Sequence, residues 1–342
     1  MLRVSSVFLA LLLTAACSVH ADRPPDSALA RGCQYLQSQQ SEDGGWHSRK
    51  YGLLKSGQSL TPFVLNTLLQ ACAVQPAALD RALAFINRNT NSEGAVGKMD
   101  PLLYDYPNYA TALAVRALVR AGKPVAHMTA WLRTQQFSEE HGWKRDDSAY
   151  GGWGMGGEPR VAPDPGHVDL SMTRHVLQAL AAAKVPATDP AWARARVFVE
   201  RCQNPDGGFY FSPVVLDANK AGQDGNGQYR SYGTATADGI LAMLALGDKP
   251  ESAQRWLTAR DIPDGAPGFT GKAYQRWTSG LRFYYAGASA EVLGAGRLLI
   301  TNLESSQHSD GSWRNPEKLG KEDDPLIATT FAISALSHAK LE

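Results

Sequence analysis

The chain has 342 residues, with 34 lysines and arginines against 33 aspartates and glutamates, 44% apolar residues, 32 glycines and 4 cysteines. This composition is typical of a globular protein with a large core, and it excludes a collagen-like, disulfide-dense or mostly disordered chain. The near-zero net charge leaves no basic excess to neutralise phosphates. We therefore expect no nucleic-acid partner.

The first residues are typical of an export signal. Arg3 precedes an apolar run, Val7–Leu13, that is too short to span a membrane as a helix. Small residues before Cys17 resemble a bacterial lipobox, in which Cys17 is lipidated, and Ser18 behind it resembles the signal for sorting to the outer membrane. The alternative is ordinary cleavage after Ala21, which discards Cys17 and releases a soluble protein. We predict a signal over 1–21 and a protein of the bacterial cell envelope, either an outer-membrane lipoprotein facing the periplasm or a periplasmic or secreted protein.

The remaining cysteines do not imply a disulfide framework. Cys33, Cys72 and Cys202 are an odd number in a compartment where paired cysteines oxidise. Buried thiols are the favoured interpretation, and a bridge between Cys33 and Cys72 on neighbouring helices is the alternative.

An internal repeat organises the rest of the chain. The clearest copy runs from Tyr35 to Asp43-Gly44-Gly45-Trp46, and close copies end at Phe209 and Trp313. More degenerate copies occur at Phe85 with Glu93-Gly94, at Trp131 to Gln136 with Gly142-Trp143, and at Trp256 with Gly268-Phe269. Glycine can take the left-handed conformation that ends a helix, the aspartate can accept from turn amides, and the aromatic ring can pack on a neighbouring helix. We interpret the element as structural.

Two kinds of helix alternate along the repeats. The helix before each glycine has one apolar stripe, as with Leu79, Leu83 and Ile86. A second pattern, apolar almost all round, follows at Leu60–Val74, Tyr106–Ala121, Val168–Ala183, Tyr232–Leu246, Trp277–Leu293 and Leu326–Ala339. A closed ring buries both kinds of face, whereas an open superhelical stack needs more constant spacing. We predict an all-α (α/α)6 toroid, with 22–342 forming one domain of six hairpins with inner and outer rings.

The Gln-x-x-Asp-Gly-Gly-Trp pattern closely resembles the QW repeat of the terpenoid cyclase and protein prenyltransferase superfamily, and the resemblance spans about 28–339. It is closest to squalene-cyclase-like repeat proteins of bacteria. The resemblance implies an α/α toroid with a central, aromatic-lined cavity.

The chemical signatures of that superfamily are missing. Class II cyclases protonate an alkene with an Asp-x-Asp-Asp acid, and the nearest stretch here, Lys321-Glu322-Asp323-Asp324, begins with lysine. Prenyltransferases hold zinc with an Asp-x-Cys pair, which does not occur here. We therefore expect no metal and no other cofactor.

Candidate site residues lie where the predicted loops meet the enclosed helices. Trp153 lies in a glycine-rich loop, Tyr150 to Gly157, that either lines a ligand or, as we favour, forms an irregular repeat turn. Asp169 is either a helix N-cap, the favoured interpretation, or a pocket acid, and Asp324 is the second candidate acid. His167 either shares a proton with Asp169 or, as we favour, faces solvent. The aromatic candidates for ligand binding are Tyr106, Tyr109, Tyr229, Tyr232, Tyr274, Trp277, Tyr284 and Tyr285, of which about half should only pack.

Three functions remain open. The leading hypothesis is an exported monomer that binds a small apolar or amphipathic, isoprenoid-like ligand in the central cavity, with or without catalysis. The second is an enzyme, either a terpenoid cyclase or isomerase or a polysaccharide-active protein, that uses pocket carboxylates. The third is a scaffold that binds proteins through its outer wall.

Overall fold

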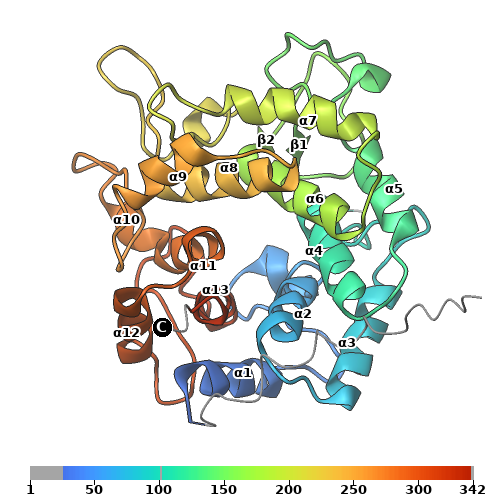
Figure 1. The fold of residues 1–342 in the computed structure, drawn as a ribbon. Helices are drawn as coiled ribbons and strands as arrows, with labels where there is room; N and C mark the ends of the chain where they lie inside the picture. Colours follow the sequence, from blue (N-terminus) through green and yellow to red (C-terminus); the bar gives the residue numbers. More distant parts are fainter. Residues whose placement is uncertain (1–25, 101, 340–342) are drawn as a thin grey trace, which may run out of the picture.

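The computed structural model describes residues 26–100 and 102–339, so the predicted signal segment and Cys17 lie outside the described residues. The described chain forms two concentric rings of helices (Figure 1). The inner ring contains α2 (Leu60–Ala71), α4 (Pro107–Arg120), α6 (Leu170–Ala182), α8 (Gly233–Ala245), α11 (Arg282–Leu293) and α13 (Pro325–Ser337). The outer ring contains α1 (Ala28–Ser38), α3 (Pro76–Arg88), α5 (Ala126–Thr134), α7 (Pro190–Arg201), α9 (Glu251–Thr258) and α12 (Arg297–Ser305).

The inner ring is closed. Each inner helix packs on the next in chain order, and α13 packs on both α2 and α1, so the two ends of the chain meet. The predicted (α/α)6 toroid is confirmed. Three short one-turn helices, at Gly52–Ser56, Glu139–His141 and Leu216–Ala218, and α10 (Arg276–Gly280) lie in the connections that enter the inner helices.

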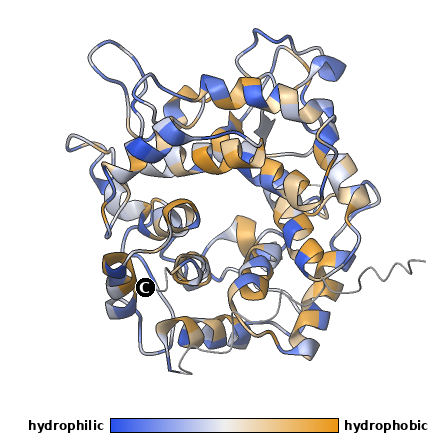
Figure 2. Ribbon diagram, in the orientation of Figure 1, coloured by the Kyte–Doolittle hydropathy of each residue, from blue (hydrophilic) through white to orange (hydrophobic). Residues whose placement is uncertain are grey.

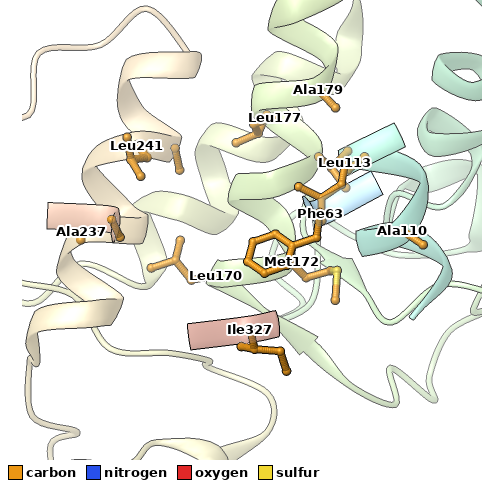
Figure 3. Packing of buried hydrophobic residues seen from close by; sticks show 14 of the residues in the cluster. Phe63, Ala110, Leu113, Leu170, Met172, Leu177, Ala179, Ala237, Leu241 and Ile327 are labelled. Carbon is orange, nitrogen blue, oxygen red and sulfur yellow. The ribbon is translucent and has the colours of Figure 1, made fainter. Parts of the chain in front are cut away.

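Burial follows the two helix patterns. The outer helices α1 and α3 carry both hydrophilic and hydrophobic residues (Figure 2), and the buried residues of α3 are Ala82, Phe85 and Ile86. The inner helices are buried on nearly all sides, and their apolar side chains form one continuous core (Figure 3). All inner helices run in the same direction, so residues at similar positions along them lie at similar depths. We call the end at which they begin the loop face, because the long connections from outer to inner helices gather there.

The repeated motif joins each hairpin to the next. The indole N–H groups of Trp46, Trp153 and Trp313 donate to carbonyls near the end of the preceding outer helix, at 2.6 to 2.7 Å. Their backbone N–H groups donate to Thr61, Thr173 and Thr329 on the following inner helices. Gly44 adopts a φ of +88°, and a Cβ there would lie 2.3 Å from the Arg81 carbonyl oxygen, so only glycine fits this turn.

The glutamine of the motif crosses to the following outer helix. Gln40 donates to the carbonyl of Ala78 in α3, and Gln136 donates to that of Ala191 in α7. Gln307 donates to the carbonyl of Ala28 in α1 and so closes the ring with the same bond. The structural interpretation of the motif fits these contacts.

The third copy of the motif differs from the prediction. Its aromatic residue is Trp153, not Trp143, since Gln136 donates to the Gly151 carbonyl and Trp153 makes the indole bond. The residues between Gln136 and Gly151 are an insertion within the motif. A short strand, β1 (Trp153–Gly154), then pairs antiparallel with β2 (Val168–Asp169).

The favoured interpretation of the cysteines is wrong for two of them. Cys33 on α1 and Cys72 at the end of α2 form a disulfide, which was the alternative, while Cys202 is a buried free thiol. Between residues 26 and 339, apart from residue 101, no helix is long and apolar enough to cross a membrane.

Candidate functional site

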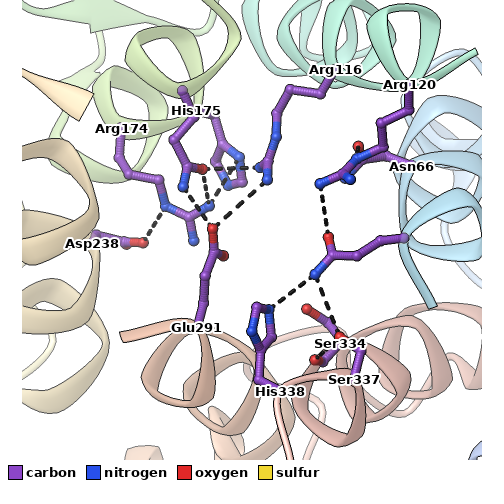
Figure 4. A network of polar contacts seen from close by, with 12 residues as sticks. Asn66, Arg116, Arg120, Arg174, His175, Asp238, Glu291, Ser334, Ser337 and His338 are labelled. Carbon is purple, nitrogen blue, oxygen red and sulfur yellow. Dashed lines mark hydrogen bonds and ion pairs between the residues drawn. The ribbon is translucent and has the colours of Figure 1, made fainter. Parts of the chain in front are cut away.

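Polar side chains from all inner helices point toward the axis of the toroid (Figure 4). This axial network comprises Asn66, Gln70, Arg116, Arg120, Arg174, His175, Gln178, Asp238, Glu291, Ser334, Ser337 and His338. Most of its members lie in the middle or second half of their helices, away from the loop face. Burying a charged side chain inside an otherwise apolar ring costs free energy unless the charge is paired, so we describe the partner of each charged group.

The middle of the network is an ion pair at the centre of the ring. Arg174 Nε donates to Asp238 at 3.0 Å, and both side chains are almost fully buried. The Tyr284 hydroxyl donates to the same carboxylate at 2.8 Å and lies 2.7 Å from the Ser171 hydroxyl. Burial opposes the charge of Arg174, but the Asp238 carboxylate outweighs it and raises the arginine's pKa.

A further set of charges lies around the toroid axis, between the second halves of the inner helices. Gln178 accepts from Arg116 at 2.9 Å and from Arg174 at 3.0 Å, and donates to Glu291 at 2.9 Å. Burial lowers the pKa of Arg116 to about 10. Burial also opposes ionisation of Glu291, yet the two arginines outweigh it and hold its pKa below the ordinary value. The two buried arginines therefore face two acidic side chains, of which Glu291 has a lowered pKa and Asp238 a pKa raised by its burial.

His175 is neutral at pH 7, because burial and the neighbouring arginines lower its pKa well below the usual value. Its Nδ1 lies 3.3 Å from Arg174, and its Nε2 has no hydrogen-bond partner among the described residues.

An aromatic collar lies above this network, nearer the loop face. It consists of Phe63, Tyr109, Tyr284 and Phe331, with ring centroids of contacting pairs 4.9 to 6.3 Å apart. A cavity of about 40 Å³ connects Phe63, Tyr284 and Phe331 to Arg116 and Glu291 below. This volume holds a few waters.

Lys220 lies at the loop face. Its Nζ lies 4.0 Å from the centroid of the Phe211 ring and 5.6 Å from that of Trp277. The Ala218 carbonyl, at 3.3 Å, is its only hydrogen-bond acceptor, and no carboxylate lies within ion-pair distance, among residues 26–100 and 102–339. Burial lowers the pKa of Lys220, although Asp169 and Asp238 act in the opposite direction. An ammonium with a single backbone acceptor is available to a ligand.

The two predicted acids cap helices. Asp169 accepts from the Met172 N–H at 2.7 Å, and Asp324 accepts from the Leu326 N–H at 3.0 Å. The other oxygen of Asp169 lies 2.8 Å from His167 Nε2, so the favoured solvent-facing interpretation of His167 is wrong. Asp324 also accepts from the Ser48 hydroxyl. The favoured N-cap interpretation of Asp169 is confirmed.

The predicted aromatic residues divide between the cavity and the wall. Tyr109 and Tyr284 belong to the collar, and Trp277 lies beside Lys220. Trp153, Tyr232 and Tyr285 are buried in the packing between helices, with at most 2% of their surface exposed, so the structure does not place them at a cavity. Tyr106 precedes α4, Tyr229 stacks on Tyr210, and Tyr274 packs near Gly222, so these three lie in the connections at the loop face.

Sequence reasoning missed the charged members of the site. Arg116, Arg174, Asp238 and Glu291 interrupt helices that are otherwise apolar, and buried charge of that kind needs a partner or a function. In the part of the chain that the structure describes, no group of three or more His, Cys, Asp or Glu side chains could hold a metal ion.

Solved structures share this fold. A type II terpene cyclase from Scytonema has a TM-score of 0.58 and 14% sequence identity, with 91% of this chain and 96% of that chain covered. Protein geranylgeranyltransferase-I from Candida albicans, complexed with GGPP, has a TM-score of 0.54 and 16% identity over 90% of each chain. Unsaturated glucuronyl hydrolase from Bacillus sp. GL1 has a TM-score of 0.56 and 14% identity, covering 91% and 94%.

No model of a known protein family matches the chain, and no curated protein matches its sequence. At this level of identity the structural likeness establishes the fold alone. The predicted resemblance is confirmed in that sense: the chain is an α/α toroid of the kind that terpene cyclases and protein prenyltransferases share.

Proposed function

We propose that the loop face binds an amphipathic, isoprenoid-like molecule with an anionic head. The head contacts Lys220, and the apolar part packs on the collar rings below. The observation that carries this proposal is the Lys220 ammonium, which is partly buried against Phe211 and Trp277 without a carboxylate partner among the described residues. A buried charge of this kind is costly alone and is stabilised by an anion.

The axial network limits how deep the ligand reaches. Arg174, Asp238 and Glu291 lie below the collar, and an apolar chain would strip them of polar contacts. The ligand's apolar part therefore stops at the collar, where the Phe331 ring rotates to admit it, while the cavity of about 40 Å³ among Arg116 and Glu291 below keeps a few waters.

Other findings support parts of this proposal. The Scytonema cyclase was solved with geranylgeranyl dihydroxybenzoate as substrate, and the Candida transferase with GGPP. The Cys33–Cys72 disulfide supports export, since such bonds persist in oxidising compartments. We assign no catalytic step, because Asp169 and Asp324 are engaged as helix caps.

The test is isothermal titration with geranyl, farnesyl and geranylgeranyl diphosphate. We expect binding of the shorter chains and little gain from geranylgeranyl, whose extra length meets the axial network. Lys220→Met should weaken binding roughly 10- to 100-fold, the equivalent of a hydrogen bond to a charged group. The same variant should unfold at a higher temperature than the wild type without ligand, because it removes an unpaired buried amine.

Lys272→Met is the matched control, since this lysine is exposed in the connection before α10. It should change neither binding nor unfolding temperature. Failure of all three diphosphates to bind, or equal affinity in Lys220→Met, would exclude the proposed function.

A further inference from the structure

A second pocket lies outside the axial cavity, beside the glycine-rich loop. Its volume is about 80 Å³, and it lies between the start of α4, the end of α5 and the segment after β1. It is lined by Asn108, Gln135, Phe137, Gly154, Met155, Gly156, Glu158, Arg160 and His167. None of the residues of the collar or around Lys220 lines it.

Two carboxamides in this pocket have unused hydrogen-bonding capacity. The Asn108 amide group donates to the Gly154 carbonyl at 2.9 Å, but its Oδ1 is buried without a partner, and only 1% of the residue is exposed. Gln135 is 6% exposed, and its side chain bonds to no other group within the described ranges. An unpaired buried polar group costs roughly 1–3 kcal/mol, so a ligand or water that pairs with Asn108 Oδ1 is stabilised here, and Gln135 offers it a second partner.

Two neighbouring side chains, His167 and Glu158, add further hydrogen-bonding groups to the pocket. His167 is held through its Nε2 by Asp169, which leaves Nδ1 without a partner among the described residues. Glu158 accepts from Lys98 through one oxygen and is otherwise exposed at the rim. The pocket thus offers acceptors and donors in several directions.

The pocket also has an apolar side. Phe137, which is 4% exposed, and the half-buried Met155 contribute apolar atoms to the lining, beside the charged Glu158 and Arg160. Gly156, with a φ of +87°, brings its backbone against Asn108, where a Cβ would lie 2.6 Å from the Asn108 nitrogen. A Cβ at Gly154 would likewise lie 2.0 Å from the His167 carbonyl oxygen, so the close backbone packing around the pocket requires glycine at both positions.

The pocket continues outward. A wider hollow of about 440 Å³, lined by Tyr104, Pro159 and Val161, shares Gly156, Glu158 and Arg160 with it. A ligand longer than the inner pocket can therefore run along the loop from 156 to 161.

We propose that this pocket and the wider hollow together form a carbohydrate-binding site: the hollow holds a pyranose ring, and the inner pocket of about 80 Å³ admits one exocyclic group of that ring, whose hydroxyl reaches the Asn108 and Gln135 amides. The rest of the hollow accommodates the next unit of a glycan chain. Amide side chains with unmet hydrogen bonds beside apolar surface match a ligand that is polar at its edge and apolar on its faces. The site is independent of the proposed isoprenoid function.

The experiment is saturation-transfer NMR on the whole protein with the methyl β-pyranosides of glucose, galactose, mannose, N-acetylglucosamine and glucuronic acid. We expect at least one of them to bind and Gln135→Leu to abolish its signal. Because Gln135 bonds to no other described residue, Gln135→Leu should fold with an unchanged or higher unfolding temperature, so loss of signal cannot be ascribed to unfolding.

Gln39→Leu is the matched control. Gln39 is the C-cap of α1, as Gln135 is the C-cap of α5, but it lies in another hairpin away from the pocket. It should retain sugar binding. The proposal is overturned if no pyranoside gives a signal, if the signal survives Gln135→Leu, or if a crystal soaked in these sugars shows ordered water only.

Discussion

At the scale of single residues, this toroid depends on side chains that satisfy buried backbone groups. The clearest examples are the threonines of the inner helices, which accept from the backbone N–H of the motif's aromatic residue. Thr61, Thr173, Thr236 and Thr329 do this, and Thr111 accepts in the same way from Val96, which takes the aromatic position of its motif; all five distances are 2.9 to 3.0 Å. The repeat is therefore defined by this threonine as much as by its tryptophan.

Adjacent threonines on α13 allow this role to be measured. Thr329 accepts from the Trp313 N–H at 3.0 Å, whereas Thr330 donates to the Leu326 carbonyl of its own helix at 2.6 Å. Both are fully buried. Thr329→Val leaves a buried donor unpaired and should lower the free energy of unfolding by roughly 1–3 kcal/mol.

Thr330→Val removes only a bond to a carbonyl that the helix already satisfies, and should change stability by less than about 0.5 kcal/mol. Urea denaturation of the two variants measures the difference. Equal losses would mean that the motif's threonine acts through packing and not through its hydroxyl.

At the scale of elements, the sequence predicts which helices belong to the inner and outer rings, but it does not predict how the buried charged residues of the inner helices pair. Apolar periodicity separated inner from outer helices because it reports which faces are buried. It could not place Arg174 and Asp238 against each other, since they lie on different helices and their pairing depends on the closed ring. The third motif was misplaced for a similar reason: Gly142-Trp143 satisfies the local pattern, while only tertiary bonding distinguishes Trp153.

The start of α11 provides an element-scale prediction about pH. The Glu322 carboxylate accepts from the backbone N–H groups of Phe283 and Tyr284 and from the Asn315 side chain. Burial nevertheless raises its pKa from 4.5 to about 7. Below pH 4.5 both the folded and unfolded states hold the proton. As the pH rises toward 7 only the unfolded state releases it, so the folded state loses relative stability.

The loss amounts to about 1.4 kcal/mol per pH unit, or roughly 3 kcal/mol across this window. Glu322→Gln, which carries no titrating group, should lack it, while the exposed Glu304→Gln should behave as the wild type. Free energies of unfolding at pH 4.5 and 7 for the three proteins provide the measurement. A constant difference between wild type and Glu322→Gln would show that Glu322 is ionised throughout.

At the scale of the whole molecule, the axial network distinguishes this protein from a toroid whose central cavity is lined by apolar side chains alone. The buried charges of the axial network lie between the second halves of the inner helices, and only the collar and the loop face offer aromatic surface to a ligand. The aromatic cavity implied by resemblance is thus shallow. Charge neutrality of the chain as a whole conceals this local arrangement, because the buried arginines face acidic side chains of the same network.

Ring closure is the other whole-molecule property, and α1 is the element on which it depends. This helix packs on α13, accepts from Gln307 through the Ala28 carbonyl, and brings Gly32 so close to Trp313 that a Cβ would lie 2.8 Å from its ring. The disulfide ties α1 through Cys33 to Cys72 at the end of α2, across 39 residues of sequence.

Removing this disulfide should therefore destabilise the contact between α1 and α13, which we call the seam, more than the rest of the ring. By loop entropy alone, a Cys33→Ala/Cys72→Ala variant should lose roughly 3–4 kcal/mol of unfolding free energy. Hydrogen exchange should accelerate first in α1 and at the Trp313 N–H, because the seam between the chain ends opens without breaking other hairpins. Cys202→Ala is the control, since this buried thiol takes no part in the link. Uniform acceleration around all inner helices would instead mean that the ring opens as one cooperative unit, with α1 no weaker than its neighbours.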